Sequence, residues 1–419
     1  MQYTSATLPL EQDRARFRVS VRGAPLLTLV VGLAVGSVHP LSAQTDRAGS
    51  GGTPGSPASP RQLLGSLVEH QEEIADPHAA AVRGFRRVHT DAYPSPGTSR
   101  DYSLSPDGAW LAHSFEYYDS IPTTGPSGVW LHQPGKDHTT KFAVQKWEAR
   151  RVSSSGATAY CYHYSAPTWS PDGTEVWFES YLGFLRGPRP GREHFPAIWS
   201  ACPDGTRPRR RTPAGVWAED PELSPGKHSL AFLSRSGPGE RDGALRVLTL
   251  STGRLRTLVR SGVRTRARWS SDGKWLAYAD HRSLYRVAPS GGQSRLLATA
   301  SDPGRGFPRD LVWLSDHNLL FNFYLFRTDP GAPHRSEVWR AGLRGAPTRL
   351  GEGEVLAGTR DGRILLMRLG QQCWRVVMRR TPRSGAQPTH PTGSRTAFVR
   401  RLRECLYSDT GRPSQRVPR

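Results

Sequence analysis

A short turn pattern recurs along the central and C-terminal parts of the chain, and it limits the possible folds more than any other feature of the sequence. An apolar residue precedes Ser-Pro-Asp-Gly, and an apolar, strand-like run follows it. Pro presets φ at the second turn position, Asp bonds back to the backbone, and Gly adopts a positive φ. We therefore expect a β-hairpin at each copy. The residues expected to lock the three clearest turns are Asp107, Gly108, Asp172, Gly173, Asp272 and Gly273.

Less regular copies extend the pattern, and each unit carries a second hairpin. The turn recurs in altered form at Ser224-Pro225-Gly226, Asp316-His317, Asp361-Gly362 and Thr392-Gly393. From residue 225 onward the copies are spaced by roughly 45 residues, which is typical of four-stranded repeats. The expected third strands contain Val129–Leu131, Ile198–Ser200, Leu245–Leu248, Leu284–Val287 and Val338–Arg340.

Four short strands per repeat make one blade of a β-propeller. The sequence therefore predicts an all-β, six-bladed propeller, with seven blades as the alternative, and a short N-terminal helical segment. The longer first two repeats place inserted loops at Tyr117 to Ser127 and Gly183 to Pro196. Because a closed ring has no exposed sheet edges, strands from both ends should complete one blade. The segment Arg87 to Ser103 could supply that closing strand.

The copies at Leu104–Gly108, Trp169–Gly173 and Trp269–Gly273 resemble the WD-like repeat of TolB-type propellers. The resemblance covers roughly residues 85–412 and is specific for the fold rather than for a function. That family includes periplasmic Tol-system proteins, the N-terminal propellers of prolyl-oligopeptidase-type peptidases and many other exported proteins, so the resemblance implies a propeller without indicating one activity. The segment between residues 60 and 104 is too short for the N-terminal α/β domain of TolB itself.

The N-terminal region predicts export. Four arginines precede the apolar run from Leu26 to Val38, whose length suits a signal peptide better than a membrane span of ~20 residues. Cleavage is expected after Ala43, and an uncleaved anchor is the alternative. The expected organisation is a signal peptide at 1–43, a linker and short helix at 44–84, the propeller at 85–412 and a tail at 413–419. The helix should begin at Ser59-Pro60, a cap followed by Pro, and reach about Asp76.

An oxidising compartment would permit disulfides among the four cysteines, Cys161, Cys202, Cys373 and Cys405. The pairings closest in sequence are Cys161–Cys202 and Cys373–Cys405, and four buried free thiols are the alternative. No Cys-x-x-Cys pair is present, so the usual spacing of a zinc site is missing.

The chain is strongly basic, with 57 Lys and Arg against 36 Asp and Glu and a net charge of +21. Such a balance can attract polyanions, although arginines spread along a chain can also serve only as solvated surface. The densest run gives the candidate binding residues Arg207, Arg209, Arg210 and Arg211. The expected partner is a protein or an anionic envelope polymer. No dedicated nucleic-acid motif accompanies these residues.

Enzyme signatures are weak in this sequence. We find no Gly-x-Ser-x-Gly elbow, no His-Glu-x-x-His and no phosphate-binding glycine loop, so no catalytic residue, metal site or cofactor is predicted. A propeller can still catalyse from its central funnel, and a lactonase-like hydrolase or a lyase with a metal in the channel remains the alternative. The sequence therefore favours a non-enzymatic, periplasmic or secreted binding scaffold.

Overall fold

The computed structural model describes residues 59–77, 79, 98–116, 128–134, 139–144, 147–153, 156–184, 195–237, 240, 242–299, 306–326 and 335–379. The chain divides into Met1–Gly55 and Ser56–Arg419, and all described residues belong to the second unit. The predicted signal segment, its cleavage site, the tail at 413–419 and Cys405 lie outside these residues. Among the described residues, no helix has the length and apolar character needed to cross a membrane.

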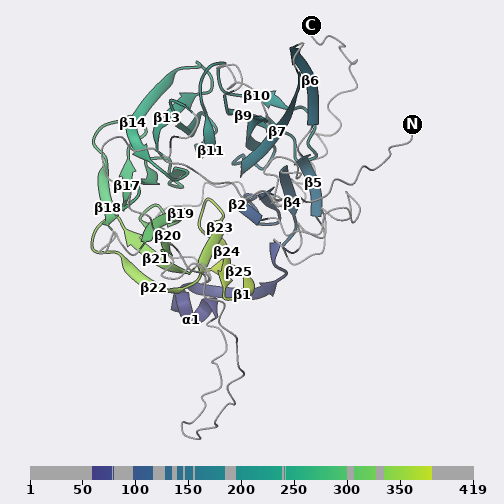
Figure 1. Ribbon diagram of the computed structural model, residues 1–419. Helices are drawn as coiled ribbons and strands as arrows, with labels where there is room; N and C mark the ends of the chain where they lie inside the picture. The colour runs from purple at the N-terminus through teal and green to yellow at the C-terminus, as the bar shows by residue number, and fades with distance from the viewer. Residues whose placement is uncertain are drawn as a thin grey trace, which may run out of the picture. The chain divides into compact units, whose positions relative to one another are not determined.

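Six antiparallel sheets surround a common centre, which confirms the predicted six-bladed propeller (Figure 1). The first strand of each repeat lies innermost, so β2, β11, β19 and β23 face the centre of the ring. The blades, from the inner strand outward, consist of β2 (Thr98–Leu104), β3 (Leu111–Glu116), β4 (Gly128–His132) and β5 (Thr139–Val144); β7 (Gly156–Trp169), β8 (Val176–Phe184), β9 (Ala197–Ala201) and β10 (Arg209–Arg210); β11 (Glu219–Leu223), β12 (Ser229–Ser234), β13 (Gly243–Thr249) and β14 (Leu255–Val263); β15 (Arg268–Trp269), β16 (Leu276–Ala279), β17 (Ser283–Val287) and β18 (Arg295–Thr299); β19 (Gly306–Ser315), β20 (Asn318–Leu325), β21 (Ser336–Gly342) and β22 (Thr348–Glu352); and β23 (Glu354–Gly358), β24 (Ile364–Leu369), β25 (Gln372–Met378) and β1 (Val68–Ile74).

The hydrophobic core is divided into six clusters, and each lies between two consecutive blades. The cluster that joins the last blade to the first contains Leu366 and Cys373 from one side and Leu104 and Leu111 from the other. Because blade six packs against blade one as the other neighbours pack, the ring is closed. In blades one to five, the apolar residue before the turn, such as Trp169 or Trp269, is buried in one of these clusters.

The turns are locked as their sequence predicts. In the first copy, the Ser105 hydroxyl donates to Asp107 Oδ1 at 2.6 Å, and the backbone N–H of Ala109 donates to the same oxygen at 3.0 Å. Equivalent serine or threonine bonds reach Asp172, Asp272 and Asp361 at 2.7 Å. The glycines Gly108, Gly173 and Gly273 have φ near +70°, a region that L side chains rarely adopt. These Asp and Gly residues therefore hold the hairpins.

The N-terminal segment differs from the prediction. The helix α1 covers only Pro60–Leu64, with the predicted Ser59 cap and Pro at the first turn, and a 3₁₀ turn follows at Gly65–Leu67. The chain then forms strand β1, which pairs antiparallel with β25 as the outermost strand of blade six. The ring is thus completed by both ends of the chain, but by residues 68–74 rather than by Arg87 to Ser103. The propeller accordingly includes residues that precede position 85.

Insertions enlarge the second blade. Strand β6 (Trp147–Ser153) pairs with the first half of β7 and makes this sheet five-stranded. The predicted loop at 117–127 lies outside the described residues, as does most of the loop predicted at 183–196.

Candidate functional site

The predicted basic run lies at the outer edge of blade two, where its members serve the fold. Arg209 and Arg210 form β10, which pairs with β9. Arg207 has a φ of +56° in the preceding turn. The Arg210 side chain donates to the backbone oxygen of Thr212 at 3.0 Å.

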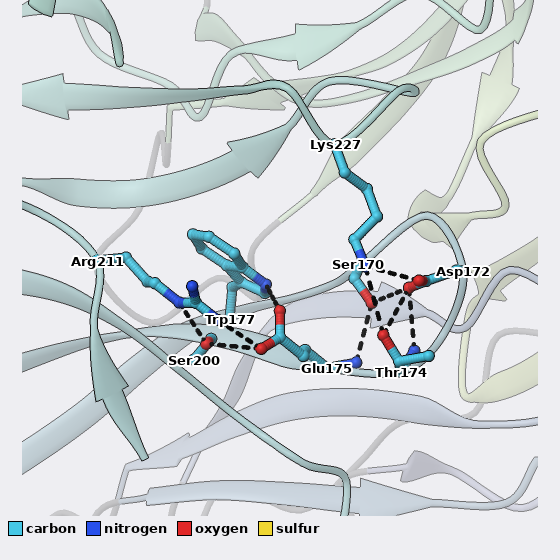
Figure 2. A network of polar contacts seen from close by, with 8 residues as sticks. All are labelled: Ser170, Asp172, Thr174, Glu175, Trp177, Ser200, Arg211 and Lys227. Carbon is cyan, nitrogen blue, oxygen red and sulfur yellow. Dashed lines mark hydrogen bonds and ion pairs between the residues drawn. The ribbon is translucent and has the colours of Figure 1, made fainter. Parts of the chain in front are cut away.

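Arg211 is held in a network of polar contacts (Figure 2). Its guanidinium bonds Glu175 Oε1 at 2.5 Å and Ser200 Oγ at 2.8 Å, and it lies 4.8 Å from the centroid of the Trp177 ring. Trp177 in turn donates its indole N–H to Glu175 at 3.1 Å. Since the charge of Arg211 is paired inside the protein, this residue is a poor candidate for ligand binding.

The same network joins blade two to blade three. The repeat in blade three has Lys227 where four of the others have Gly, with a φ of +58°, and its ammonium contacts Asp172 Oδ2 at 2.6 Å. Burial alone would raise the pKa of Asp172, but the bonds from Lys227, Ser170 and Thr174 hold it at about 2. Figure 2 shows Lys227 reaching from its own turn to the turn of the preceding blade.

The inner strands carry a repeated irregularity that the sequence analysis missed. Four residues before the first turn position, the chain bulges and takes a positive φ at Asp101, Ala166, Asp220 and Asp310. Asp tolerates this left-handed conformation better than most residues do. The recurrence of Asp at this position in blades one, three and five was the signal that could have identified it.

These bulges place a layer of charge in the channel. Asp101 accepts a bond from the Ser114 hydroxyl at 2.8 Å, and Asp310 accepts one from Asn322 Nδ2 at 3.2 Å. Asp220 lies 3.8 Å from the guanidinium of Arg266, which is itself buried and donates to the Pro167 carbonyl oxygen at 3.0 Å. The channel is therefore charged at the level of these bulges.

Burial raises the pKa of three carboxyl groups beside this layer. Glu179 is fully buried, and burial together with the charges of Glu219 and Asp220 raises its pKa well above the ordinary value. Burial also raises the pKa of Asp220, and it raises that of Glu219 to about 7 despite the opposing charge of Arg235. Raised carboxyl pKa values in a cleft often accompany acid–base function.

The channel is closed at the face that carries the repeated turns. Arg360, at the turn of blade six, donates from Nη1 to the Leu223 carbonyl oxygen of blade three at 2.5 Å. Arg268 of blade four donates to Glu222 Oε2 at 3.0 Å in the same layer. These groups, with Tyr102 and Ser103, line a cavity of about 40 Å³. Ligands larger than this cavity would have to enter from the opposite face.

That opposite face, which we call the mouth, contains a larger cavity of about 390 Å³. It lies where the inner strands of blades four and five begin, beside the loop that follows β12 of blade three. Its lining residues are Arg235, Glu240, Arg264, Thr265, Phe307, Pro308 and Arg309.

The three arginines of the mouth differ in how they are paired. Arg235 forms an ion pair with the buried Glu219, and Arg264 forms one with the exposed Asp242. Arg309 is exposed and lies 5.6 Å from the centroid of the Tyr324 ring. No ion pair involving Arg309 is found within the described residues. Arg309 is therefore the mouth cation that is most available to a ligand.

Aromatic rings adjoin Arg309 on blade five. Phe307 stacks on Tyr324 with ring centroids 6.1 Å apart and contacts Phe326 at 5.7 Å. Phe326 is 51% exposed, which is unusual for a large apolar side chain. The mouth thus combines a cation with the half-buried ring of Phe307, which contacts the exposed ring of Phe326.

The states of the cysteines differ from the predicted disulfide pairing in one respect. Cys202 is disulfide-bonded, whereas Cys373 is a free thiol buried between blades six and one. The predicted Cys373–Cys405 pairing is therefore wrong. The partner of Cys202 is Cys161 or Cys405, whose side chains lie outside the described part of the structure. In the described part of the chain, no group of three or more His, Cys, Asp and Glu side chains is arranged to hold a metal ion.

Comparisons with known proteins find similar structures but no similar annotated sequence. No protein-family model matches the chain, and no curated protein matches it. A structure named as TolB from Agrobacterium tumefaciens is 17% identical, with 69% of this chain and 93% of that chain covered and a TM-score of 0.42. TolB from Acinetobacter baumannii is 14% identical, with 68% and 55% covered and a TM-score of 0.39. An oligogalacturonate lyase from Vibrio parahaemolyticus is 11% identical, with 76% and 98% covered and a TM-score of 0.40. The assignment as a six-bladed propeller rests on the sheets and cores described above.

Proposed function

We propose that this propeller is an exported binding scaffold, and that it takes an anionic envelope polymer at its mouth. The observation that carries the proposal is the 390 Å³ cavity in which Arg309, without an ion pair among the described residues, lies beside Phe307. Guanidinium groups bind carboxylates and phosphates through paired hydrogen bonds, and exposed rings add stacking area. The net charge of +21 would attract such a polymer from a distance.

The proposed binding residues differ from those that the sequence indicated. Arg211 is paired with Glu175, whereas Arg309 has a ring beneath it and an open cavity beside it. Since the turn face is closed around Arg360, the polymer would lie across the mouth rather than thread through the ring.

The test is a comparison of two exposed arginines. Arg309→Ala should weaken binding of dextran sulfate or poly-glutamate by about tenfold, the loss expected for one charge-assisted contact. Arg254→Ala, at an exposed turn on the other face, should leave affinity within about twofold of the wild type. Isothermal titration at several salt concentrations should also show affinity falling as salt rises. Equal losses in both variants, or affinity that does not change with salt, would contradict the proposal.

A funnel enzyme is the second candidate, and Glu219 is the observation that favours it. Its pKa of about 7 suits a general acid or base near neutral pH. Glu219 pairs with Arg235, which lines the mouth cavity, and it accepts a bond from the Trp217 indole at 2.6 Å. The reaction would be hydrolysis of a lactone or ester, or elimination from an acidic sugar.

This alternative predicts turnover that depends on Glu219. The wild-type protein, screened against lactones, esters and uronic acid polymers, should show a pH profile that inflects near pH 7, and Glu219→Gln should abolish turnover. Metal analysis of the purified protein would show whether the channel holds an ion. Turnover that persists in Glu219→Gln would remove this residue from the mechanism.

We also propose that the chain reaches the periplasm or the medium after cleavage behind Ala43. The support is the arginine-flanked apolar run from Leu26 to Val38 and the bonded state of Cys202. N-terminal sequencing of the mature protein should begin at Gln44. An intact N-terminus in the membrane fraction would instead indicate an anchor.

A further inference from the structure

The closed end of the channel carries more positive than negative side-chain charge. The cavity of about 40 Å³ is lined by two arginines, Arg268 and Arg360, and by one carboxylate, Glu222. Ser103 also lies on its wall, and its hydroxyl accepts from the Trp169 backbone N–H at 3.3 Å. This cavity is separate from the mouth cavity, and no residue lines both.

The single carboxylate, Glu222, already accepts hydrogen bonds from two protein groups. Glu222 Oε2 accepts from Arg268 Nη1 at 3.0 Å and from the Thr168 hydroxyl at 3.3 Å, and the Glu222 side chain is only 7% exposed. Arg360 instead donates to the Leu223 carbonyl oxygen, which carries no net charge. Its guanidinium therefore has no carboxylate in contact within the described residues.

The surroundings of Arg360 show the same imbalance. Burial lowers its pKa first, the charge of Glu222 opposes this, and the charge of Arg268 lowers the pKa further. The next acid along the channel, Asp310, acts on Arg268 but is bonded to Asn322. Both guanidinium groups are only partly buried, so the repulsion between them is incompletely screened and a counter-charge at this position would be favourable.

We propose that the cavity between Arg268 and Arg360 binds a small monovalent anion, chloride or an ion of similar size such as formate. The cavity of about 40 Å³ exceeds the roughly 10–15 Å³ that one water needs, and it is too small for a sugar or a peptide. The anion would join blades four and six at the axis and complete the seal of the turn face. The site is independent of polymer binding at the mouth.

The first test measures the thermal stability of the full chain at pH 7 and constant ionic strength. Replacing gluconate, which is too large for the cavity, by chloride should give a saturable rise in Tm of about 2 °C or more, because a ligand that binds only the folded state stabilises it. Formate should have the same effect. Chloride-35 NMR should show excess line broadening that follows the same saturation curve. A Tm that does not respond to the identity of the anion would overturn the proposal.

Two variants and a control test whether chloride stabilises the protein by binding in this cavity. Arg360→Gln should raise the half-saturating chloride concentration by about tenfold or more, the loss expected for one charged contact. Ser103→Asp places a carboxylate on the cavity wall, so its Tm in gluconate should match or exceed that of the wild type and should not respond to chloride. Arg254→Gln removes the same charge at an exposed turn and should keep the wild-type response.

The outcomes separate a specific site from general screening. Loss of the chloride response in Ser103→Asp with retention in Arg254→Gln supports the axial site, even if Arg360→Gln fails to fold. An unchanged response in Ser103→Asp would place the chloride elsewhere and overturn the assignment. Polymer affinity, measured in parallel, should be the same in wild type and Ser103→Asp, so failure of the mouth site would be recognised independently.

Discussion

At the residue scale, a few side chains occupy left-handed backbone positions and also make polar contacts in the ring. Lys227 occupies a left-handed position normally given to Gly, and its ammonium reaches Asp172 in the neighbouring blade. Asp101, Asp220 and Asp310 occupy the bulge of alternate inner strands and at the same time bring carboxylates to the channel. Single positions therefore fix both the backbone and the local charge.

The Lys227–Asp172 contact predicts a dependence of stability on acid pH. The pKa of Asp172 is lowered to about 2 in the folded state. A lowered carboxyl pKa stabilises the fold above the unfolded pKa, and that stabilisation is lost as pH falls from about 4 to about 2. Because the pair is partly exposed, we expect Asp172→Asn to lower the free energy of unfolding by about 1 kcal/mol at pH 7.

Urea unfolding of wild type and Asp172→Asn between pH 2 and pH 7 would measure this difference. The two curves should converge near pH 2. Asp107→Asn is the matched control, because Asp107 locks its own turn through Ser105 and the Ala109 N–H. A constant difference across the whole pH range would show that the ion pair contributes little.

The cysteines give a second prediction at this scale. Burial raises the pKa of the Cys373 thiol to about 11, and the residue is 2% exposed, so it should not react with a thiol reagent in the native protein at pH 8. In denaturant without reductant, Cys373 and the one cysteine that is not bonded to Cys202 should react. Reduction should raise the count to all four cysteines, and peptide mapping would identify the partner of Cys202.

At the scale of the element, the repeats were predictable because the residues that determine each hairpin lie within that hairpin. The Pro, Asp and Gly of the turns act on neighbouring backbone, and the apolar alternation on each side sets the strands. Strand β1 was predicted as helix for the opposite reason. Leu64, Val68 and Ile74 suit a helical face as well as a strand, and only pairing with β25, some three hundred residues away, decides between them.

Strand β1 should therefore matter for stability in proportion to its packing. Val68 is 1% exposed and packs in the cluster with Met378 and Val376. Val68→Ala should lower the free energy of unfolding by about 2 kcal/mol, from lost apolar burial and the cavity left behind. Glu69→Ala, at an exposed position of the same strand, should change it by less than about 0.5 kcal/mol. Equal effects in chemical denaturation would show that β1 is only loosely attached.

At the scale of the whole molecule, the channel is built from residues that no local pattern brings together. Glu222, Arg268 and Arg360 come from three different blades and meet only because the ring closes. A bulge also inserts one residue into an inner strand. The alternation of inward-facing and outward-facing side chains therefore shifts there, and a period-two pattern would not have identified the residues that face the axis. The sequence thus predicted the six-bladed ring, whereas the arginines of the proposed sites are ones that it did not single out.

Removal of the closing strand should affect the entire ring. Deletion of residues 1–75 leaves β25 as an open sheet edge, so we expect a lower Tm, a broader thermal transition and concentration-dependent association. A synthetic peptide of residues 59–77 added in excess should restore the transition. Circular dichroism and size-exclusion chromatography would follow both effects. An unaltered melting curve would mean that five blades and a three-stranded sixth suffice.

The pairing of β1 with β25 also determines when the ring can close during synthesis. The segment at 68–74 is synthesised roughly three hundred residues before its partner at 372–378. A nascent chain that has not yet reached β25 has an unpaired β1 and an unfinished ring, so local hairpins can form early while closure waits for β25. A chain with this order of strands keeps an open ring until β25 has been made, which would suit the proposed export in an unfolded state.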